Sequence, residues 1–199
     1  MTIDFAFKRR LFPFLLVFYE IGSYLSNDLY LPSMPRIAHD LGASIQQTQY
    51  TLSLWVLGSG LFQLFLGPLG DRIGRRPVLL FGAALFTAST LGCAWAPGVE
   101  WMWLARFLQG ASICALITAG YATLHQLYQG KEAVQLLALM GAVIILAPAL
   151  GPVLGALLLK FMSWRTLFLT LAAWGLLSWA GLYALMPETR NPSAASMGP

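Results

Sequence analysis

The chain has 199 residues, of which 58% are hydrophobic and only 10% are charged, and its net charge is +4. Soluble domains carry about 25% charged residues, so this composition excludes an ordinary soluble protein. The sequence also has no cluster of metal ligands, no glycine-rich phosphate loop and no nucleic-acid-binding repeat, and both of its cysteines, Cys93 and Cys114, lie in apolar runs. We therefore expect no metal, no cofactor and no nucleic-acid partner.

Apolar runs of about 20 residues, the length needed to cross about 30 Å of hydrocarbon, occur six times. They lie at roughly 11–31, 50–69, 77–96, 101–124, 134–159 and 165–186. The connections between them are short. The sequence therefore predicts an all-α membrane protein in which residues 1–190 form a bundle of six transmembrane helices and residues 191–199 form a disordered tail.

Basic residues are distributed unequally between the two sides of this predicted bundle. The side of the termini holds Lys8, Arg9, Arg10, Arg72, Arg75, Arg76, Lys131 and Arg190. The other side holds Arg36, Lys160 and Arg165, together with the boundary tryptophans Trp95, Trp101, Trp103 and Trp164. An excess of Lys and Arg marks the cytoplasmic side, and Trp is enriched at membrane boundaries. The pattern predicts that both termini are cytoplasmic.

The first apolar run contains two acids, Glu20 and Asp28. At about 100° per residue, Tyr24 and Asn27 fall on the same stripe of the helix as these acids, and Ser23 lies beside it. An ionised side chain at mid-membrane depth costs about 2.5 to 3.5 kcal/mol, so the stripe is expected to face a protein interior or a wet cavity. The stripe is either a cation or proton site or a buried polar cluster that orders helix packing.

A polar connection comes next in the chain, with His39 and Asp40 near its middle. These two side chains are too few to bind a metal, and we expect a solvated loop there.

The turn after the second run contains three glycines, an acid and three arginines. Glycine permits a tight turn, and the arginines can contact anionic headgroups. Asp71 can pair with these arginines or cap the positive N-terminus of a nearby helix. The residues are Gly67, Leu69, Asp71, Arg72, Gly74, Arg75 and Arg76.

This set of residues matches the loop signature between the second and third helices of the major facilitator superfamily. The first span, with Glu20, Tyr24, Asn27 and Asp28, resembles the drug/proton antiporter branch of MdfA-type multidrug transporters, whereas residues 30–37 are similar to the Bcr/CflA type. The resemblance covers residues 10–190 and implies one six-helix half of a major-facilitator fold. The ending at residues 186–190 resembles the passage into that family's central cytoplasmic loop.

The fourth apolar run carries Arg106, with Gln109 a turn further on. An arginine in hydrocarbon needs a partner, and Asp28 is expected at a similar depth. The run resembles the family's fourth-helix motif, whose arginine takes part in proton coupling; the alternative is a fixed buried ion pair. Tyr121 is a candidate cavity wall, and His125 is expected near the cytoplasmic boundary.

The fifth apolar run contains Pro148, Gly151, Pro152 and Gly155, which predict a bent and closely packed helix. This segment resembles the family's antiporter motif, except that Ala147 and Ala156 stand where glycines are common.

The resemblance implies multidrug efflux by proton antiport across a bacterial-type inner membrane, with lipophilic and often cationic drugs as substrates. The implied partners are the drug, protons, the lipid bilayer and a second six-helix half, which is either missing from this chain or supplied by self-association. A transport-inactive half or a membrane interaction protein is the alternative. An intramembrane hydrolase using Ser59 and His125 is disfavoured because His125 belongs at the cytoplasmic end of its span, so we expect no enzyme activity.

Overall fold

The computed structural model describes residues 5–186 and consists there of helices and short connections, without a strand. The helices are α1 (Phe5–Asp28), η1 (Leu31–Ser33), α2 (Met34–Asp40), α3 (Ile45–Ile73), α4 (Arg75–Ala94), α5 (Val99–Ala115), η2 (Leu116–Gly120), α6 (Tyr121–Leu127), α7 (Gly130–Leu158) and α8 (Trp164–Leu185). Because α5, the π-helical turn η2 and α6 run on without a break, six long helical rods result. The predicted all-α class with six long helices is confirmed; the predicted tail lies outside the described residues.

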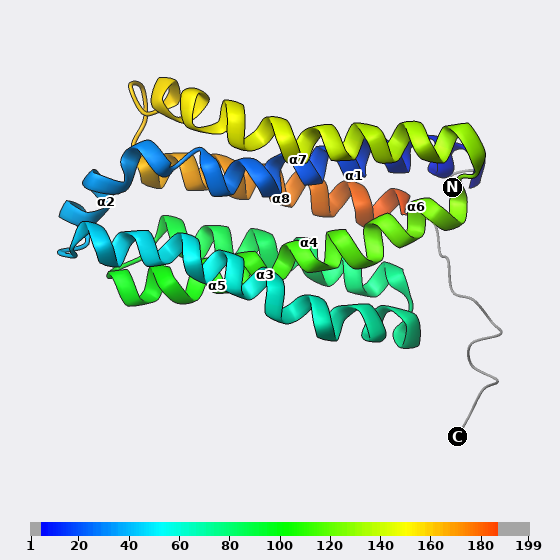
Figure 1. Cartoon of the computed structure of the whole chain (residues 1–199), viewed down its shortest axis with the longest axis horizontal. Helices are drawn as coiled ribbons and strands as arrows, with labels where there is room; N and C mark the ends of the chain where they lie inside the picture. Colours follow the sequence, from blue (N-terminus) through cyan, green and yellow to red (C-terminus); the bar gives the residue numbers. More distant parts are fainter. Residues whose placement is uncertain (1–4, 187–199) are drawn as a thin grey trace.

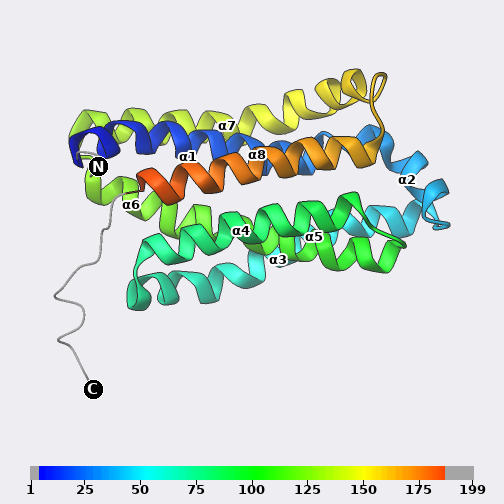
Figure 2. The same ribbon diagram turned by 180° about the vertical axis from the view of Figure 1, so that it is seen from behind.

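The six rods form two groups of three (Figure 1). Helices α1, α7 and α8 lie together, and α3, α4 and the α5–α6 rod form the second group, as the reverse view also shows (Figure 2). Helix α4 packs against α8, and η2 touches α1, so the two groups share one core.

The bundle has two distinct ends. We call the end that holds α2, the α4–α5 connection and the α7–α8 connection the α2 end; the α3–α4 turn and the start of α1 lie at the opposite end (Figure 1). Trp95, Trp101 and Trp164 stand at helix boundaries of the α2 end. The tryptophan girdle expected from the sequence therefore gathers at one end of the bundle.

Five of the helical rods are long and apolar enough to cross a membrane. Helix α1 is not among them because its polar stripe lowers its mean hydropathy, although its 24 residues match a span in length. Its polar stripe is turned inward, where Glu20 and Ser23 are buried. These helices make the chain a multi-pass membrane protein, in which α1 packs against α7 and α8.

Local sequence explains the start and end of α3. Ser44 and Gln47 form a reciprocal capping box, in which the Ser44 hydroxyl accepts from Gln47 N at 3.1 Å and Gln47 Oε1 accepts from Ser44 N at 2.8 Å. This satisfies two amides that the first turn of a helix leaves free. At the other end Gly74 has φ +99°, a conformation that favours glycine, and it separates α3 from α4.

The expected solvated loop after the first span is wrong in part. Residues 34–40 form helix α2, and α3 already begins at Ile45. Ile37 and Ala38 are buried, whereas His39 is exposed as expected. Asp40 accepts a hydrogen bond from Trp164 Nε1 at 2.8 Å, and this bond holds the pKa of the carboxyl below its usual range. The segment is ordered because its apolar residues cover the core of the α2 end.

Helices α3 and α5 approach so closely that their backbones touch through glycines. A Cβ on Gly110 would collide with the carbonyl of Trp55, and a Cβ on Gly58 would collide with that of Phe107. Small residues allow such approaches between membrane helices. The α3–α5 contact therefore depends on glycine at two matching positions.

We expect Gly110→Ala to destabilise the protein by about 1–3 kcal/mol, because overpacking against backbone cannot be relieved by side-chain movement. The matched control is Gly60→Ala on α3, where a Cβ would meet no atom within 4 Å. Thermal unfolding of detergent-solubilised protein, followed by tryptophan fluorescence, measures both. Equal stability of the two variants would contradict the close approach.

Candidate functional site

The two acids of α1 are both buried inside this bundle. Glu20 is 0% exposed and Asp28 is 7% exposed. They are eight positions apart, which corresponds to about 12 Å along a helix. The site is therefore not one carboxylate pair but two carboxylates at different depths, each with its own neighbours.

Glu20 is held by a tyrosine from the other group of helices. Tyr121 Oη donates to Glu20 Oε1 at 2.7 Å, while Glu20 Oε2 is buried and has no hydrogen-bond partner among the described residues. Tyr24, one turn along α1 and half-buried, lies on the same helix face. The side chain that binds Glu20 is thus that of Tyr121, which the sequence suggested only as a cavity wall.

Tyr121 directly succeeds the π-helical turn η2. A π turn inserts an extra residue into an α-helix and rotates the next helical turns about the axis, and such turns are frequent at functional sites. Gly120, the last residue of η2, lies against Leu16 of α1, where a Cβ would be 2.9 Å from Leu16 Cδ1. The π turn and this glycine together bring Tyr121 to Glu20.

Arg106 is fully buried on α5 and binds the end of α1. It donates to Ser26 O at 3.2 Å and to Asn27 Oδ1 at 2.7 Å, and it also donates to Gln109 Oε1. Ser26 O is one of the last carbonyls of α1, which lack helical partners and carry the negative end of the helix dipole. The guanidinium therefore neutralises a helix terminus.

Two further groups complete this network. The Arg106 guanidinium lies 4.5 Å from the centre of the Tyr30 ring, a cation–π contact. Gln109 Nε2 donates to Thr90 Oγ1 of α4 at 2.7 Å. Ser26, Tyr30 and Thr90 are not among the site residues expected from the sequence. Of the three, only Tyr30 has a signal there, as an aromatic residue just after the acidic stripe.

Asp28 does not form an ion pair with Arg106 within 4.0 Å among the described residues. Asn27 stands between them, because its Nδ2 donates to Asp28 Oδ1 at 3.3 Å while its Oδ1 accepts from Arg106. The two residues are therefore linked through Asn27 and not by a direct ion pair, and the choice between proton coupling and a structural role for them stays a prediction. The similar depth expected for the two residues is consistent with this one-residue bridge.

The proline–glycine segment of α7 packs directly on Asp28. A Cβ on Gly151 would lie 2.5 Å from Asp28 Cβ, and a Cβ on Gly155 would collide with the carbonyl of Leu29. Pro148 and Pro152 lie inside α7. The antiporter-like segment and the acidic helix thus share one tight contact.

The residues from Gly67 to Arg76 lie at the opposite end from α2. Arg75 Nη2 is 3.9 Å from Asp71 Oδ1, and Arg75 also donates to Ala122 O of α6. Arg76 donates to Tyr183 O of α8 at 2.8 Å. Close to Asp71 in the sequence, Arg72 is exposed and Gly67 is half-buried. The arginines tie the α3–α4 turn to α6 and α8, while the Asp71 side chain is 77% exposed.

Ser59 and His125 do not form a catalytic arrangement. His125 is exposed in α6, two residues before that helix ends, and no hydrogen bond joins it to Ser59 within residues 5–186. The Ser59 carbonyl accepts from Cys114 Sγ at 2.6 Å, a packing contact.

Comparison with known proteins agrees with this architecture. A sequence model described as Major Facilitator Superfamily matches residues 16–198. The chain is 38% identical over 178 residues to the multidrug resistance protein MdtM of Escherichia coli K12, covering 89% of this chain and 43% of that protein. It is 37% identical over 184 residues to the multidrug transporter MdfA of Yersinia pestis, covering 92% and 45%. With the MdfA of Edwardsiella ictaluri the identity is 38% over 182 residues, covering 92% and 44%. The chain spans less than half the length of these relatives.

We expect Tyr121→Phe to destabilise the protein by about 1–3 kcal/mol, because it leaves both oxygens of buried Glu20 without a partner. Tyr183→Phe is the matched control, since Tyr183 is 59% exposed and its ring contacts do not need the hydroxyl. Unfolding in mixed micelles measures both variants. Combining Tyr121→Phe with Glu20→Gln must give less than the sum of the single effects; simple additivity would argue against the bond.

We also expect Gly151→Ala to destabilise the protein by about 1–3 kcal/mol, because its Cβ would push α7 away from Asp28. Gly141→Ala, on the same helix, meets no atom within 4 Å and should be neutral or slightly stabilising. Thermal unfolding compares them, and an equal response at both glycines would refute the proposed contact.

Proposed function

This chain belongs to the major facilitator superfamily, and from that membership we propose that it forms the N-terminal half of a multidrug/proton antiporter. In this proposal the protein lies in a bacterial inner membrane with both termini in the cytoplasm. It exports lipophilic, often cationic drugs in exchange for protons. It is a transporter and not an enzyme, and its cargo is a small molecule.

The proposal rests on the hydrogen bonding of the Glu20 carboxylate. One carboxylate oxygen accepts a hydrogen bond from Tyr121, and the other is buried without a partner among the described residues. An ionised carboxylate with a free oxygen in a low-dielectric interior is costly. Either a proton or a cationic substrate relieves that cost, so the two compete for the same oxygen.

The charge balance of the buried network supports the same competition. Glu20 and Asp28 together carry two negative charges when ionised, and Arg106 carries one positive charge. One net negative charge then remains to attract a cation or a proton. A proton that enters from outside neutralises an acid, weakens the hold on the drug and favours its release. The proton gradient supplies the free energy.

A hollow beside the acidic stripe suits the apolar part of such a drug. It has a volume of about 260 Å³ between α1 and α7, and its lining, which includes Ile21, Leu25, Val143 and Leu150, is entirely hydrophobic. Ile21 follows Glu20 in the sequence, and its side chain points about 100° away from Glu20 around the helix. The hollow would hold the apolar body of a lipophilic drug on the α7 side of α1.

A second six-helix bundle is proposed to supply the other wall. Transporters of this kind bind substrate between two bundles near the midplane of the membrane. Helices α3 and α7 are the least covered of the apolar helices here, with Leu64 and Ile145 each 73% exposed. We infer that these exposed faces pack against the second half. The exposed Asp71 would then interact with the positive N-terminus of one of the helices in that half.

The second candidate is a transport-inactive half that persists as a membrane interaction protein. It is favoured by the burial of both acids within this bundle, which leaves neither of them open to a drug before the helices move. Drug-dependent proton release from the purified chain, measured together with its oligomeric state, separates the two candidates. A monomer without any response supports the inactive half.

Glu20→Gln combined with Asp28→Asn is expected to abolish proton-coupled efflux in an assembly with a second six-helix half, because no competing negative charge remains. The matched control is Glu100→Gln with Asp40→Asn, which removes two exposed acids at the α2 end. Drug-induced pH changes in inverted membrane vesicles measure the coupling. Unchanged transport by the first variant would sink the proposal, and so would equal loss in the control.

A further inference from the structure

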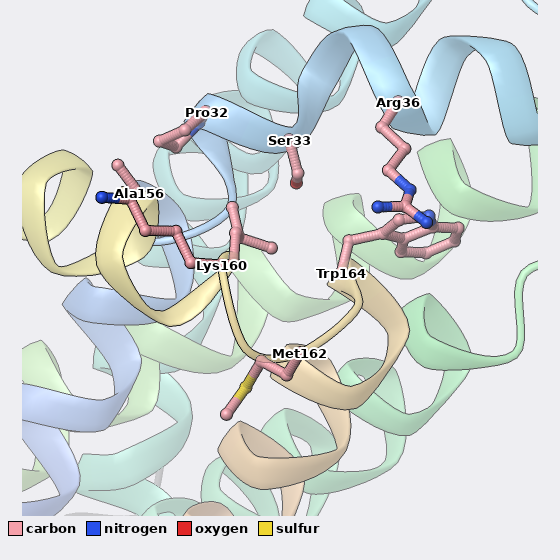
Figure 3. A pocket seen from close by; sticks show the side chains of 8 residues that line it. Pro32, Ser33, Arg36, Ala156, Lys160, Met162 and Trp164 are labelled. Carbon is pink, nitrogen blue, oxygen red and sulfur yellow. The ribbon is translucent and has the colours of Figure 1, made fainter.

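A hollow of about 280 Å³ opens at the α2 end, and two basic residues from distant parts of the chain line it. Arg36 reaches from α2 toward Trp164, and Lys160 comes from the end of α7 on the opposite side (Figure 3). Pro32, Leu159 and Met162 supply apolar walls. No acidic residue lines the hollow.

The positive charge of this hollow is not compensated by an ion pair inside the described part of the chain. Neither the Arg36 guanidinium nor the Lys160 ammonium forms a hydrogen bond or an ion pair within 4.0 Å there, and both residues are exposed; the positive charge of Arg36 also acts on Asp40. Asp40, the acid on α2, already accepts from Trp164 at 2.8 Å and lies 3.4 Å from His39. Arg165, just outside, donates to Ala94 O and Ala96 O and stacks on Trp164 at 4.3 Å.

The placement of these cations is unusual for this end of the bundle. Of the residues that the structure describes there, Arg36, Lys160 and Arg165 are the positively charged ones. Arg165 stacks on Trp164 and Arg36 points toward it, whereas the Lys160 side chain extends toward Ala156 on the other side of the hollow (Figure 3). Basic residues are disfavoured in the loops on the non-cytoplasmic side of a membrane. Two of these cations, Arg36 and Lys160, line one hollow from opposite sides, which points to an anion.

The surroundings of the hollow match the boundary between headgroups and acyl chains. Phe161 beside it is 87% exposed, and Leu154 and Leu157, further along α7, are 42% and 49% exposed. Tryptophans mark the same level, where Trp95 is 66% exposed. A polar cationic hollow therefore continues directly into an apolar surface, which suits an amphiphile rather than a freely soluble anion.

We propose that this hollow binds the headgroup of an anionic phospholipid from the leaflet at the α2 end. Arg36 and Lys160 contact the phosphate, and the acyl chains lie along Leu154 and Leu157. Two cations in a lining that contains no acid favour a headgroup with net negative charge over a zwitterionic headgroup, whose ammonium group would add a third positive charge.

The bound lipid would also connect two elements that flank the acidic site. Arg36 belongs to the segment after α1, and Lys160 lies just past the end of α7. Just below the hollow, Gly155 of α7 packs against Leu29 and Gly151 packs against Asp28. A phosphate that bridges the two cations holds the α1 and α7 ends together beside Asp28, so the lipid would stabilise this contact.

Native mass spectrometry of the full purified chain in detergent tests the proposal. The probes are phosphatidylglycerol and phosphatidylcholine with the same acyl chains. We expect tighter binding of phosphatidylglycerol, and a loss of about thirtyfold in its affinity in Arg36→Gln/Lys160→Gln, as two surface cations imply. Arg10→Gln/Lys131→Gln, which removes two exposed cations from the opposite end, should retain wild-type affinity.

Further measurements show whether the bound anion is a lipid or a soluble ion, and single variants show whether a loss of binding reflects misfolding. Lys160→Gln alone changes one exposed side chain, and Arg36→Lys keeps the charge; the first should weaken binding and the second should preserve most of it. Equal affinity for the two lipids, or equal losses in the hollow variant and the control, would overturn the proposal. Displacement of phosphatidylglycerol by millimolar inorganic phosphate would overturn it too, because the ligand would then be a soluble anion.

Discussion

The buried guanidinium of Arg106 is the interaction on which the arrangement of the site depends. A cation in the core of a membrane protein must find its partners inside the bundle, and Arg106 is fully buried there. It finds them at the end of α1, where Ser26 O and Asn27 Oδ1 accept from it, and on Gln109 of its own helix. This contact places the end of α1, and with it Asp28, relative to α5.

The same contact separates the roles of the two acids. Asp28 reaches Arg106 only through Asn27, and α7 presses on it through Gly151. Glu20 lies about two turns earlier in α1. It has Tyr121 as its partner and one oxygen without a partner among the described residues. Asp28 is thus enclosed between packed helices, whereas Glu20 retains one carboxylate oxygen, Oε2, that can accept a further hydrogen bond or a proton. The assignment of drug and proton to these residues stays a prediction, but their different surroundings provide a physical basis for it.

Close backbone approach is the second constraint, and it is distributed over the whole bundle. Glycines bring α3 to α5 at Gly110, α7 to α1 at Gly155 and α4 to α5 at Gly82, where a Cβ would collide with Ala115. Such contacts replace the hydrophobic driving force that is absent between helices in lipid. They also explain why a helix as polar as α1 can be accommodated, since its stripe is covered by neighbours that lie at backbone distance.

The sequence by itself determined the all-helical class, the six long helices and the acids that face inward, because hydropathy over about 20 residues and the 100° step of a helix are local properties. The match of residues Gly67 to Arg76 to a family motif is likewise evident from the sequence alone. Only the tertiary structure decided which groups meet. The Tyr121–Glu20 bond depends on a π turn, the Asn27 bridge depends on side-chain rotamers, and the ordering of α2 depends on burial of Ile37. Each arises from contacts between helices far apart in sequence, which no local pattern encodes.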